Sequence, residues 1–253
     1  MKNIVFQLLL FLSPVVVIAG DGDYAVNKIP DSLTENANVV KRAETFRFEV
    51  LDLGRSRLYH KYALTVLNEK GDKYAMEVVG YDKLTEFRSM EGSLYDADGK
   101  KIKSLKKSEI KDLSAMDDIS LMDDNRIKVH GFFHRIYPYT VEYETEVQIN
   151  FNMFFPVWSP LGGENMSVEQ SAMTLVVPAA FAVRFKAFNY QGAPTKKTEK
   201  DKDIYRWDIT NLKAIQLEYA SPNWSDMMPV VYLGPVQFEF EKFQGDISTW
   251  QGL

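Results

Sequence analysis

The feature that most constrains the fold is an alternation of apolar and polar residues with a period of two. Over residues 139–151 the odd-numbered positions are apolar except for Thr145, and the even-numbered positions carry polar side chains. Residues 45–50 and 58–66 alternate in the same way. Because successive side chains of a strand point to opposite faces, these segments are predicted to be half-buried β-strands.

Further runs of strand-like sequence cover residues 166–177, 183–188, 204–209 and 230–240. Two turn signals, residues 68–71 and 96–99, end in a glycine, which we expect to supply the positive φ that a hairpin loop needs. A chain of 253 residues that is 45% apolar can bury one large core. We therefore predict an all-β chain, an antiparallel β-sandwich of about ten strands, over residues 21–245.

The N-terminal segment is typical of a secretory signal peptide. Lys2 precedes an apolar run over residues 4–18, and the small residues Ala19 and Gly20 follow it. The run is shorter than the roughly 20 residues that a membrane-spanning helix needs, although a retained anchor stays open as an alternative. We expect residues 1–20 to be a signal peptide, the mature chain to be periplasmic or on the cell surface, and no integral membrane segment to remain after cleavage.

Composition excludes several kinds of chemistry. The chain has no cysteine, so it has no disulfide, no Cys-ligated metal and no thiol nucleophile. Its net charge of −5 disfavours binding to nucleic acid, which depends on a basic surface. It also lacks the Gly-x-Ser-x-Gly, phosphate-loop and dinucleotide-binding motifs. We expect no cofactor and no enzymatic activity.

Some residues resemble parts of a catalytic or metal site, but a structural role is the better interpretation of each. The histidines His130 and His134 stand four apart on strand-like sequence, and His60 lies on an apolar strand face. The other groups are a calcium-loop mimic at Asp96, Asp98 and Gly99, four aspartates in a polar connection (Asp117, Asp118, Asp123 and Asp124), three glutamates on one strand face (Glu142, Glu144 and Glu146), and six lysines that we interpret as protecting an edge strand (Lys100, Lys101, Lys103, Lys106, Lys107 and Lys111).

The serial order of several short motifs resembles a known family. These motifs are Tyr137-Pro138-Tyr139-Thr140-Val141-Glu142-Tyr143, Phe155-Pro156-Val157-Trp158-Ser159-Pro160, Tyr81-Asp82, Val168-Glu169, Pro178, and Trp207 with Asn211, Glu218 and Pro222. Together they resemble the domain of unknown function that precedes transglutaminase-like domains in exported bacterial proteins. The resemblance implies a β-sandwich in which the chemistry belongs to the following domain, with its Cys, His and Asp; no catalytic residue carries over to this chain.

Two functions follow as hypotheses. The first is a non-catalytic exported module of a transglutaminase-like system that acts as a scaffold or recognises a protein partner. The second is a glycan-binding module that uses exposed aromatic side chains as stacking platforms, for which the candidates are Tyr137, Tyr139, Phe154, Phe155 and Trp158. Residues 246–253 are expected to start a connector helix capped by Ser248, which leaves Trp250 exposed as a possible partner contact.

Export predicts a processed N-terminus. Mass spectrometry of the protein expressed in a Gram-negative host should find a mature chain that begins at Gly20 or Asp21, because cleavage follows the small residues after the apolar run. Recovery of intact Met1 from the membrane fraction would show a retained anchor instead.

Overall fold

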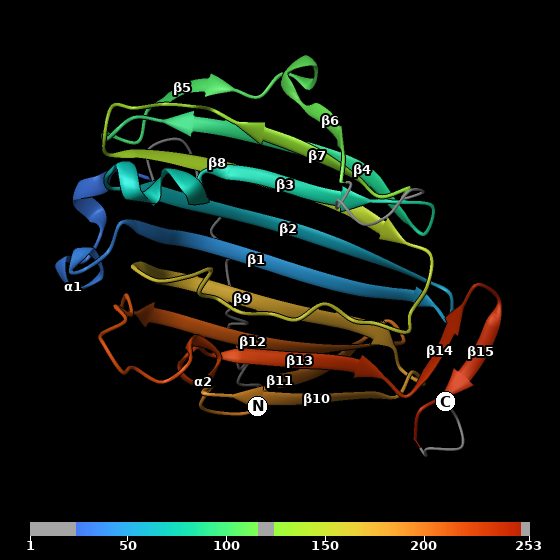
Figure 1. The fold of residues 1–253 in the computed structure, drawn as a ribbon. Helices are drawn as coiled ribbons and strands as arrows, with labels where there is room; N and C mark the ends of the chain where they lie inside the picture. Colours follow the sequence, from blue (N-terminus) through green and yellow to red (C-terminus); the bar gives the residue numbers. More distant parts are fainter. Residues whose placement is uncertain (1–23, 116–123, 249–253) are drawn as a thin grey trace, which may run out of the picture.

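The computed structural model describes residues 24–115 and 124–248, and these residues are dominated by β-strands (Figure 1). Their helices are two single α-helical turns, α1 (Asp31–Thr34) and α2 (Trp224–Met227), and three 3₁₀ segments, η1 (Val26–Lys28), η2 (Glu69–Tyr74) and η3 (Lys107–Glu109). The strands are β1 (Val39–Asp52), β2 (Arg55–Val66), β3 (Met76–Tyr81), β4 (Thr85–Tyr95), β5 (Lys101–Ser104), β6 (Lys111–Ser114), β7 (Arg126–Gly131), β8 (Tyr139–Ile149), β9 (Met166–Pro178), β10 (Val183–Phe188), β11 (Thr195–Glu199), β12 (Lys202–Leu212), β13 (Val230–Pro235), β14 (Gln237–Phe240) and β15 (Phe243–Asp246).

One sheet of eight strands forms the frame of the molecule. Its strand order is β11-β12-β9-β1-β2-β8-β4-β5. Its pairs are antiparallel except for β1 and β9, which run parallel from Val39 beside Met166 to Glu49 beside Val176. The expected all-β class is confirmed, whereas the expectation of purely antiparallel pairing is wrong at this central pair. The parallel pair arises because β9 returns to the sheet beside the first strand of the chain.

Two smaller sheets cover one face of this frame and complete a sandwich-like arrangement. The sheet β3-β7-β6 lies over the part of the frame around β8 and β4, where Val79 of β3 packs with Met90 and Val147. The sheet β10-β13 lies over β9 and β12, where Val231 packs into a cluster with Trp207. Figure 1 shows the two small sheets in front of the large one, each over a different half. A fourth sheet, β14-β15, lies to one side.

The predicted alternation of faces is confirmed in the central strands. In β8 the odd-numbered residues 139–147 are buried, and the intervening glutamates are half-buried on the other face. In β1, Phe48 and Val50 are buried, whereas Arg47 and Glu49 are half-buried on the opposite face. The period of two therefore identified which side chains form the core between the layers.

The two predicted glycine turns have different outcomes. Gly99 has φ of 80° in the turn between β4 and β5, as expected. The expectation for Gly71 is wrong, because this residue lies in η2, is not among the positive-φ glycines, and follows a cap that Asn68 forms on Lys70 N. A Cβ at Gly71 would lie 2.5 Å from the carbonyl oxygen of Asn38. This glycine is therefore required by the close approach of another chain segment.

Three of the lysines singled out in the sequence lie on strands at the edges of sheets. Lys101 and Lys103 lie on β5, the edge strand of the large sheet, and Lys111 begins β6 at the edge of a small sheet, so the edge-protection interpretation is confirmed for these residues.

Asp246, the first residue of the expected connector, is the last residue of β15. Most of the expected helix, with Trp250, lies outside the described residues, as does the expected signal peptide. Within the described ranges, no helix is long and apolar enough to cross a membrane.

The assignment of faces predicts two different effects on stability. Tyr143→Ala should lower the free energy of unfolding by about 3–5 kcal/mol, because the Tyr143 side chain is fully buried between the layers. Glu144→Ala should lower it by no more than about 0.5 kcal/mol, because this neighbouring side chain is 38% exposed. Urea unfolding of the two variants measures both values, and equal losses would contradict the assigned faces.

Candidate functional site

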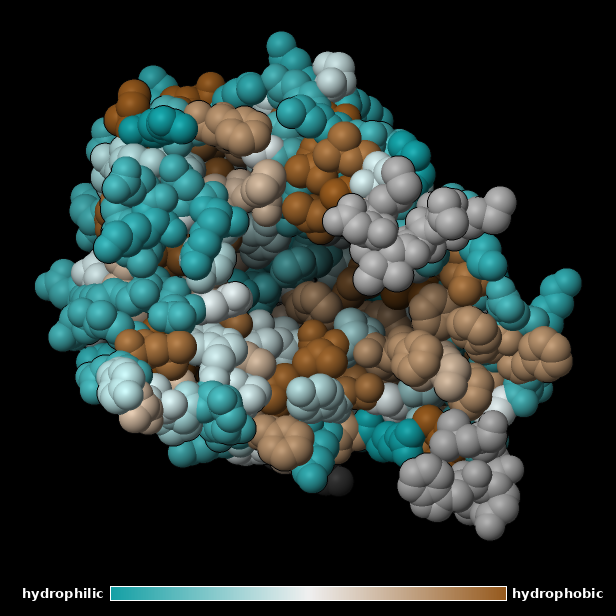
Figure 2. All heavy atoms as spheres, in the orientation of Figure 1, coloured by the Kyte–Doolittle hydropathy of each residue, from teal (hydrophilic) through white to brown (hydrophobic). Residues whose placement is uncertain are grey.

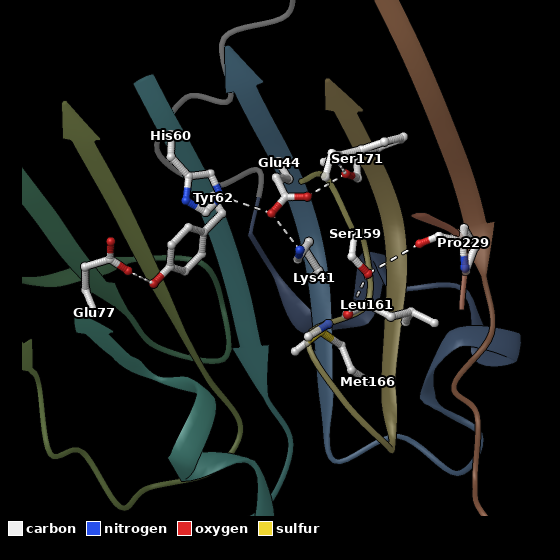
Figure 3. Close-up of polar contacts among 12 residues, drawn as sticks. Lys41, Glu44, His60, Tyr62, Glu77, Ser159, Leu161, Met166, Ser171 and Pro229 are labelled. Atoms are coloured by element: carbon white, nitrogen blue, oxygen red, sulfur yellow. Dashed lines mark hydrogen bonds and ion pairs between the residues drawn. The ribbon is translucent and has the colours of Figure 1, made fainter. Parts of the chain in front are cut away.

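A buried charged cluster joins three strands of the large sheet. The carboxylate of Glu44 on β1 accepts hydrogen bonds from Lys41 Nζ at 2.6 Å and from Ser171 Oγ at 2.5 Å, and it lies 3.0 Å from His60 Nε2. Only 5% of the Glu44 side chain is exposed. Figure 3 shows these four residues converging from β1, β2 and β9. We call Lys41, Glu44, His60 and Ser171 the Glu44 cluster.

A β-bulge explains how this cluster forms. Residues three apart in a regular strand point to opposite faces, yet Lys41 and Glu44 form an ion pair. The register of β1 against β2 shifts between Lys41 and Ala43, so one extra residue brings both side chains to the same face. The bulge thus places a lysine and a glutamate together in the core, where each compensates the buried charge of the other.

Burial acts on both buried carboxylates, but only at Glu44 do the neighbouring groups outweigh it, so the two pKa values shift in opposite directions. Burial alone would raise the pKa of Glu44, but the charge of Lys41 and the hydrogen bond with His60 outweigh it and lower this pKa to about 2. Burial raises the pKa of Glu77 on β3, although the hydroxyl of Tyr62 donates a hydrogen bond to this carboxylate (Figure 3). Glu44 is therefore held as an anion, whereas Glu77 has no cation paired with it in the described part of the chain.

These polar groups connect the layers of the fold. Ser171 Oγ accepts a hydrogen bond from Trp158 Nε1 at 3.1 Å and donates its own hydrogen to the Glu44 carboxylate, so this buried hydroxyl links the indole of Trp158 to the Glu44 cluster. His130 Nδ1 lies 2.8 Å from the hydroxyl of Tyr143 inside the core. His60 likewise bonds to Glu44. His134 packs edge-on against the ring of Tyr139, with 5.2 Å between the ring centres. Each of the three histidines thus contacts another side chain of the fold.

An aromatic groove is the second feature, and residues 153–157 and the β10-β13 sheet line most of it. The groove has a volume of about 510 Å³. Exposed aromatic side chains line it: Phe154 is 64% exposed, Tyr232 48% and Phe185 42%. Figure 2 shows hydrophobic residues gathered over this part of the surface, on the lower right of the view. Its lining consists of Met153, Phe154, Phe155, Val157, Arg184, Phe185, Lys186, Tyr232, Leu233, Gly234, Pro235 and Ile247.

The groove lies beside residues 153–157, between the points where the chain is bonded to Glu239 of β14 and to Val231 of β13. Asn152 donates its backbone N–H to the carbonyl of Glu239 at 3.0 Å, and Trp158 exchanges two backbone hydrogen bonds with Val231. Ser159 Oγ donates to the carbonyl of Pro229 at 3.3 Å (Figure 3). Residues 153–157, which we call the arch, span the distance between these anchors. Within the described ranges, the arch makes no backbone hydrogen bond with β13.

Two cations accompany the aromatic side chains. Arg184 and Lys186 of β10 line the groove and are exposed. Neither forms a salt bridge with a carboxylate of the described residues; Arg184 Nη1 donates to the carbonyl of Ile247, and Lys186 Nζ lies 4.8 Å from the ring centre of Phe188. The groove is thus apolar with a positive margin, on a chain that is acidic as a whole. Sequence analysis missed Arg184, Phe185 and Tyr232, because they come together from separate strands.

The structure does not bring the five candidate stacking residues together. Tyr139, Phe155 and Trp158 are buried, with exposures of 2%, 8% and 1%. Tyr137 is half-buried, and its hydroxyl donates to Asp72 at 2.6 Å. Phe154 is the strongly exposed member of this set, and it lines the aromatic groove together with Phe155.

The carboxylates singled out in the sequence are engaged in turns and ion pairs. Asp96 Oδ1 accepts from the N–H groups of Asp98 and Lys100, which is the predicted tight turn. Glu142 accepts from the hydroxyl of Tyr24 at 2.6 Å. Asp117, Asp118 and Asp123 lie outside the described residues. Among those that are described, no three metal-ligating side chains form a cluster that could hold an ion.

One protein family matches most of this chain. The family described as a domain of unknown function with a solved structure (DUF3857) matches residues 52–216. The chain belongs to this family. The DUF3857 match begins at the last residue of β1 and ends after β12, so it covers most of the large sheet and the Tyr137–Pro160 motifs. No curated protein matches the sequence.

Solved structures resemble the chain in fold. A structure described as a putative protease from Parabacteroides distasonis aligns with a TM-score of 0.64 and 12% identity over 78% of this chain, which spans 40% of that one. An M1 zinc metallopeptidase from Deinococcus radiodurans aligns with a TM-score of 0.36 and 6% identity, over 83% of this chain and 46% of that one. The first likeness shows a shared fold; the second is too distant to carry an argument.

The Glu44 cluster predicts a pH-dependent contribution to stability. Because the pKa of Glu44 falls from its ordinary 4.5 to about 2 on folding, its contribution is complete above pH 4.5 and is lost as the pH falls toward 2. Glu44→Gln should cost about 3–5 kcal/mol at pH 7, since it leaves the Lys41 ammonium buried and unpaired. The difference from the wild type should shrink below pH 4.5.

Urea unfolding of both proteins at several pH values between 7 and 3 measures this difference. The double variant Lys41→Met/Glu44→Gln is the control, and it should lose less stability than Glu44→Gln because it retains no unpaired charge. A difference that stays constant down to pH 3 would show that the Glu44 carboxylate does not carry the effect.

Proposed function

We propose that this chain is an exported, non-catalytic β-sandwich module that binds a companion polypeptide through the aromatic groove. The single observation that carries the proposal is the exposure of Phe154, Phe185 and Tyr232 around one cavity of about 510 Å³. Exposed apolar patches of this kind mark sites of interaction in soluble proteins. Aromatic side chains beside an arginine are also typical of the centres of protein interfaces.

The companion that fits the family best is a transglutaminase-like domain or protein. The resemblance in the sequence implies a module that stands beside a domain carrying Cys, His and Asp, and this chain has no cysteine of its own. The shared fold covers 40% of a chain described as a putative protease, which supports a module that works beside a second, larger part. Binding, scaffolding and positioning of such a partner are the roles that we assign to this module.

Glycan binding is the other candidate, and the groove supports it less well. Sugar recognition combines an exposed ring face with several hydrogen-bonding side chains that fix the hydroxyl groups. The groove supplies ring faces, but its lining is mainly apolar, with Arg184, Lys186 and the Tyr232 hydroxyl as its polar side chains. Most of the five candidate stacking residues are buried or half-buried elsewhere.

Site-specific photo-crosslinking in the native host tests the proposal. Benzoylphenylalanine in place of Phe154 or Tyr232 should form a covalent adduct with one discrete polypeptide, because both side chains face the groove and are exposed. The same probe in place of Tyr219, which is fully exposed but does not line the groove, is the matched control.

Mass spectrometry identifies the adduct. A transglutaminase-like sequence linked from Phe154 and Tyr232 but not from Tyr219 supports the proposal. Absence of a groove-specific adduct, together with retention of the chain on an insoluble polysaccharide that Phe154→Ala abolishes, would favour the glycan-binding alternative and overturn it.

A further inference from the structure

The outer edge of β13 offers unpaired backbone groups to the groove. Trp158 and Val231 exchange both backbone hydrogen bonds, with N···O distances of 3.0 and 2.9 Å. Backbone groups of successive residues in an antiparallel strand point alternately to the two sides. Those of Tyr232 therefore point to β10, and those of Leu233 point to the arch. The bond from Val236 N to the carbonyl of Ala182 agrees with this alternation, since even-numbered residues face β10.

The arch does not form hydrogen bonds with the backbone groups at this edge of β13. The register set by Trp158 and Val231 would place Pro156 opposite Leu233. Proline has no N–H to donate to the Leu233 carbonyl, and no hydrogen bond joins Leu233 to the arch within the described ranges. Pairing stops after one bridge, and the groove occupies the space beyond it. Leu233 N–H, Leu233 C=O and Pro235 C=O thus form a short open strand edge along an apolar groove.

A positive charge lies beside this edge because of one glycine. Gly234 has no side chain, and the side chain of Arg184 from the neighbouring strand lies across it: a Cβ built on Gly234 would be 3.5 Å from Arg184 Nε. The guanidinium is exposed and forms no salt bridge with the described residues. A residue paired opposite Gly234 would meet this cation on the outer face of the sheet, so an acidic side chain at that position is favoured.

We infer that the groove binds an extended peptide segment by strand addition to β13, and that the segment carries an acidic residue flanked by apolar ones. This inference rests on the proposed function and names how the companion polypeptide binds. The last paired residue of the segment exchanges two hydrogen bonds with Leu233, and the residue two positions before it donates to the Pro235 carbonyl. The acidic residue between them pairs with Arg184, and the apolar side chains contact Phe154 and Val157.

Fluorescence anisotropy with the synthetic peptide acetyl-Phe-Val-Asp-Val-amide, labelled at its N-terminal end, tests the binding mode on the mature chain; the peptide ends opposite Leu233 because Val231 is already paired with Trp158. N-methylation of the last Val should weaken binding about tenfold, because it removes the bond to the Leu233 carbonyl. N-methylation of Asp should change affinity less than twofold, since that N–H points away from β13. This dependence on alternate backbone positions is a property of strand addition and requires no mutation of the protein.

Charge reversal tests the pairing with Arg184. Arg184→Glu should weaken binding of the Asp peptide about tenfold and improve binding of the corresponding Lys peptide. Lys107→Glu, a change of equal charge in η3 on a different part of the surface, is the control and should leave both affinities within twofold.

The outcomes separate this inference from the proposed function. A groove-specific adduct at Phe154 combined with equal effects of the two N-methyl groups would support the proposed binding of a companion polypeptide but overturn strand addition as its binding mode. Failure of the peptide to bind at 1 mM would overturn it as well. Binding of dodecanoate that displaces the peptide, with no difference between the N-methylated positions, would make the groove a site for apolar carboxylates instead.

Discussion

The Glu44 cluster ties together three neighbouring strands in the middle of the large sheet, whose inner face is covered in two parts. Each small sheet contributes to an apolar cluster of its own, one with Val79, Met90 and Val147 and the other with Trp158 and Trp207. Glu44 bonds to β2 through His60 and to β9 through Ser171, and Ser171 in turn holds the indole N–H of Trp158. One carboxylate thereby fixes the positions of three strands and of the residue at which the arch rejoins β13. The location of the groove depends on this anchor.

The groove itself follows from how the arch is built. Asn152 and Trp158 are both buried and hydrogen-bonded, so the five residues between them have fixed ends. Pro156 prevents the arch from continuing its pairing with β13, and the exposed Phe154 and Val157 are left on the surface. A hydrogen-bonded continuation at these positions would have closed the edge of β13. The absent N–H of one proline thus leaves this strand edge open beyond the Trp158–Val231 pair.

Much of the fold could be predicted from the sequence, because the alternation of residues 139–151 is a local signal that burial of one face requires. The parallel pairing of β1 with β9 was not predictable in this way, since it joins segments more than a hundred residues apart. The Glu44 cluster was missed because Lys41 and Glu44 have the wrong spacing for one strand face, and the bulge that unites them leaves no pattern in the sequence. Phe154 and Phe155 were identified as candidates from composition alone; only the path of the arch shows that Phe154 faces solvent.

The parallel pair also governs the order in which the chain can fold. The pairings of β1 with β2 and of β2 with β8 join strands within the first 149 residues, but the other edge of β1 stays open until β9 has been made. The pairing of Val39 with Met166 joins residues that are 127 positions apart in the sequence. Such a high contact order slows folding and leaves a central, apolar strand exposed in the partly made chain. A chain with this topology completes its central sheet only after residues 166–176 have been made.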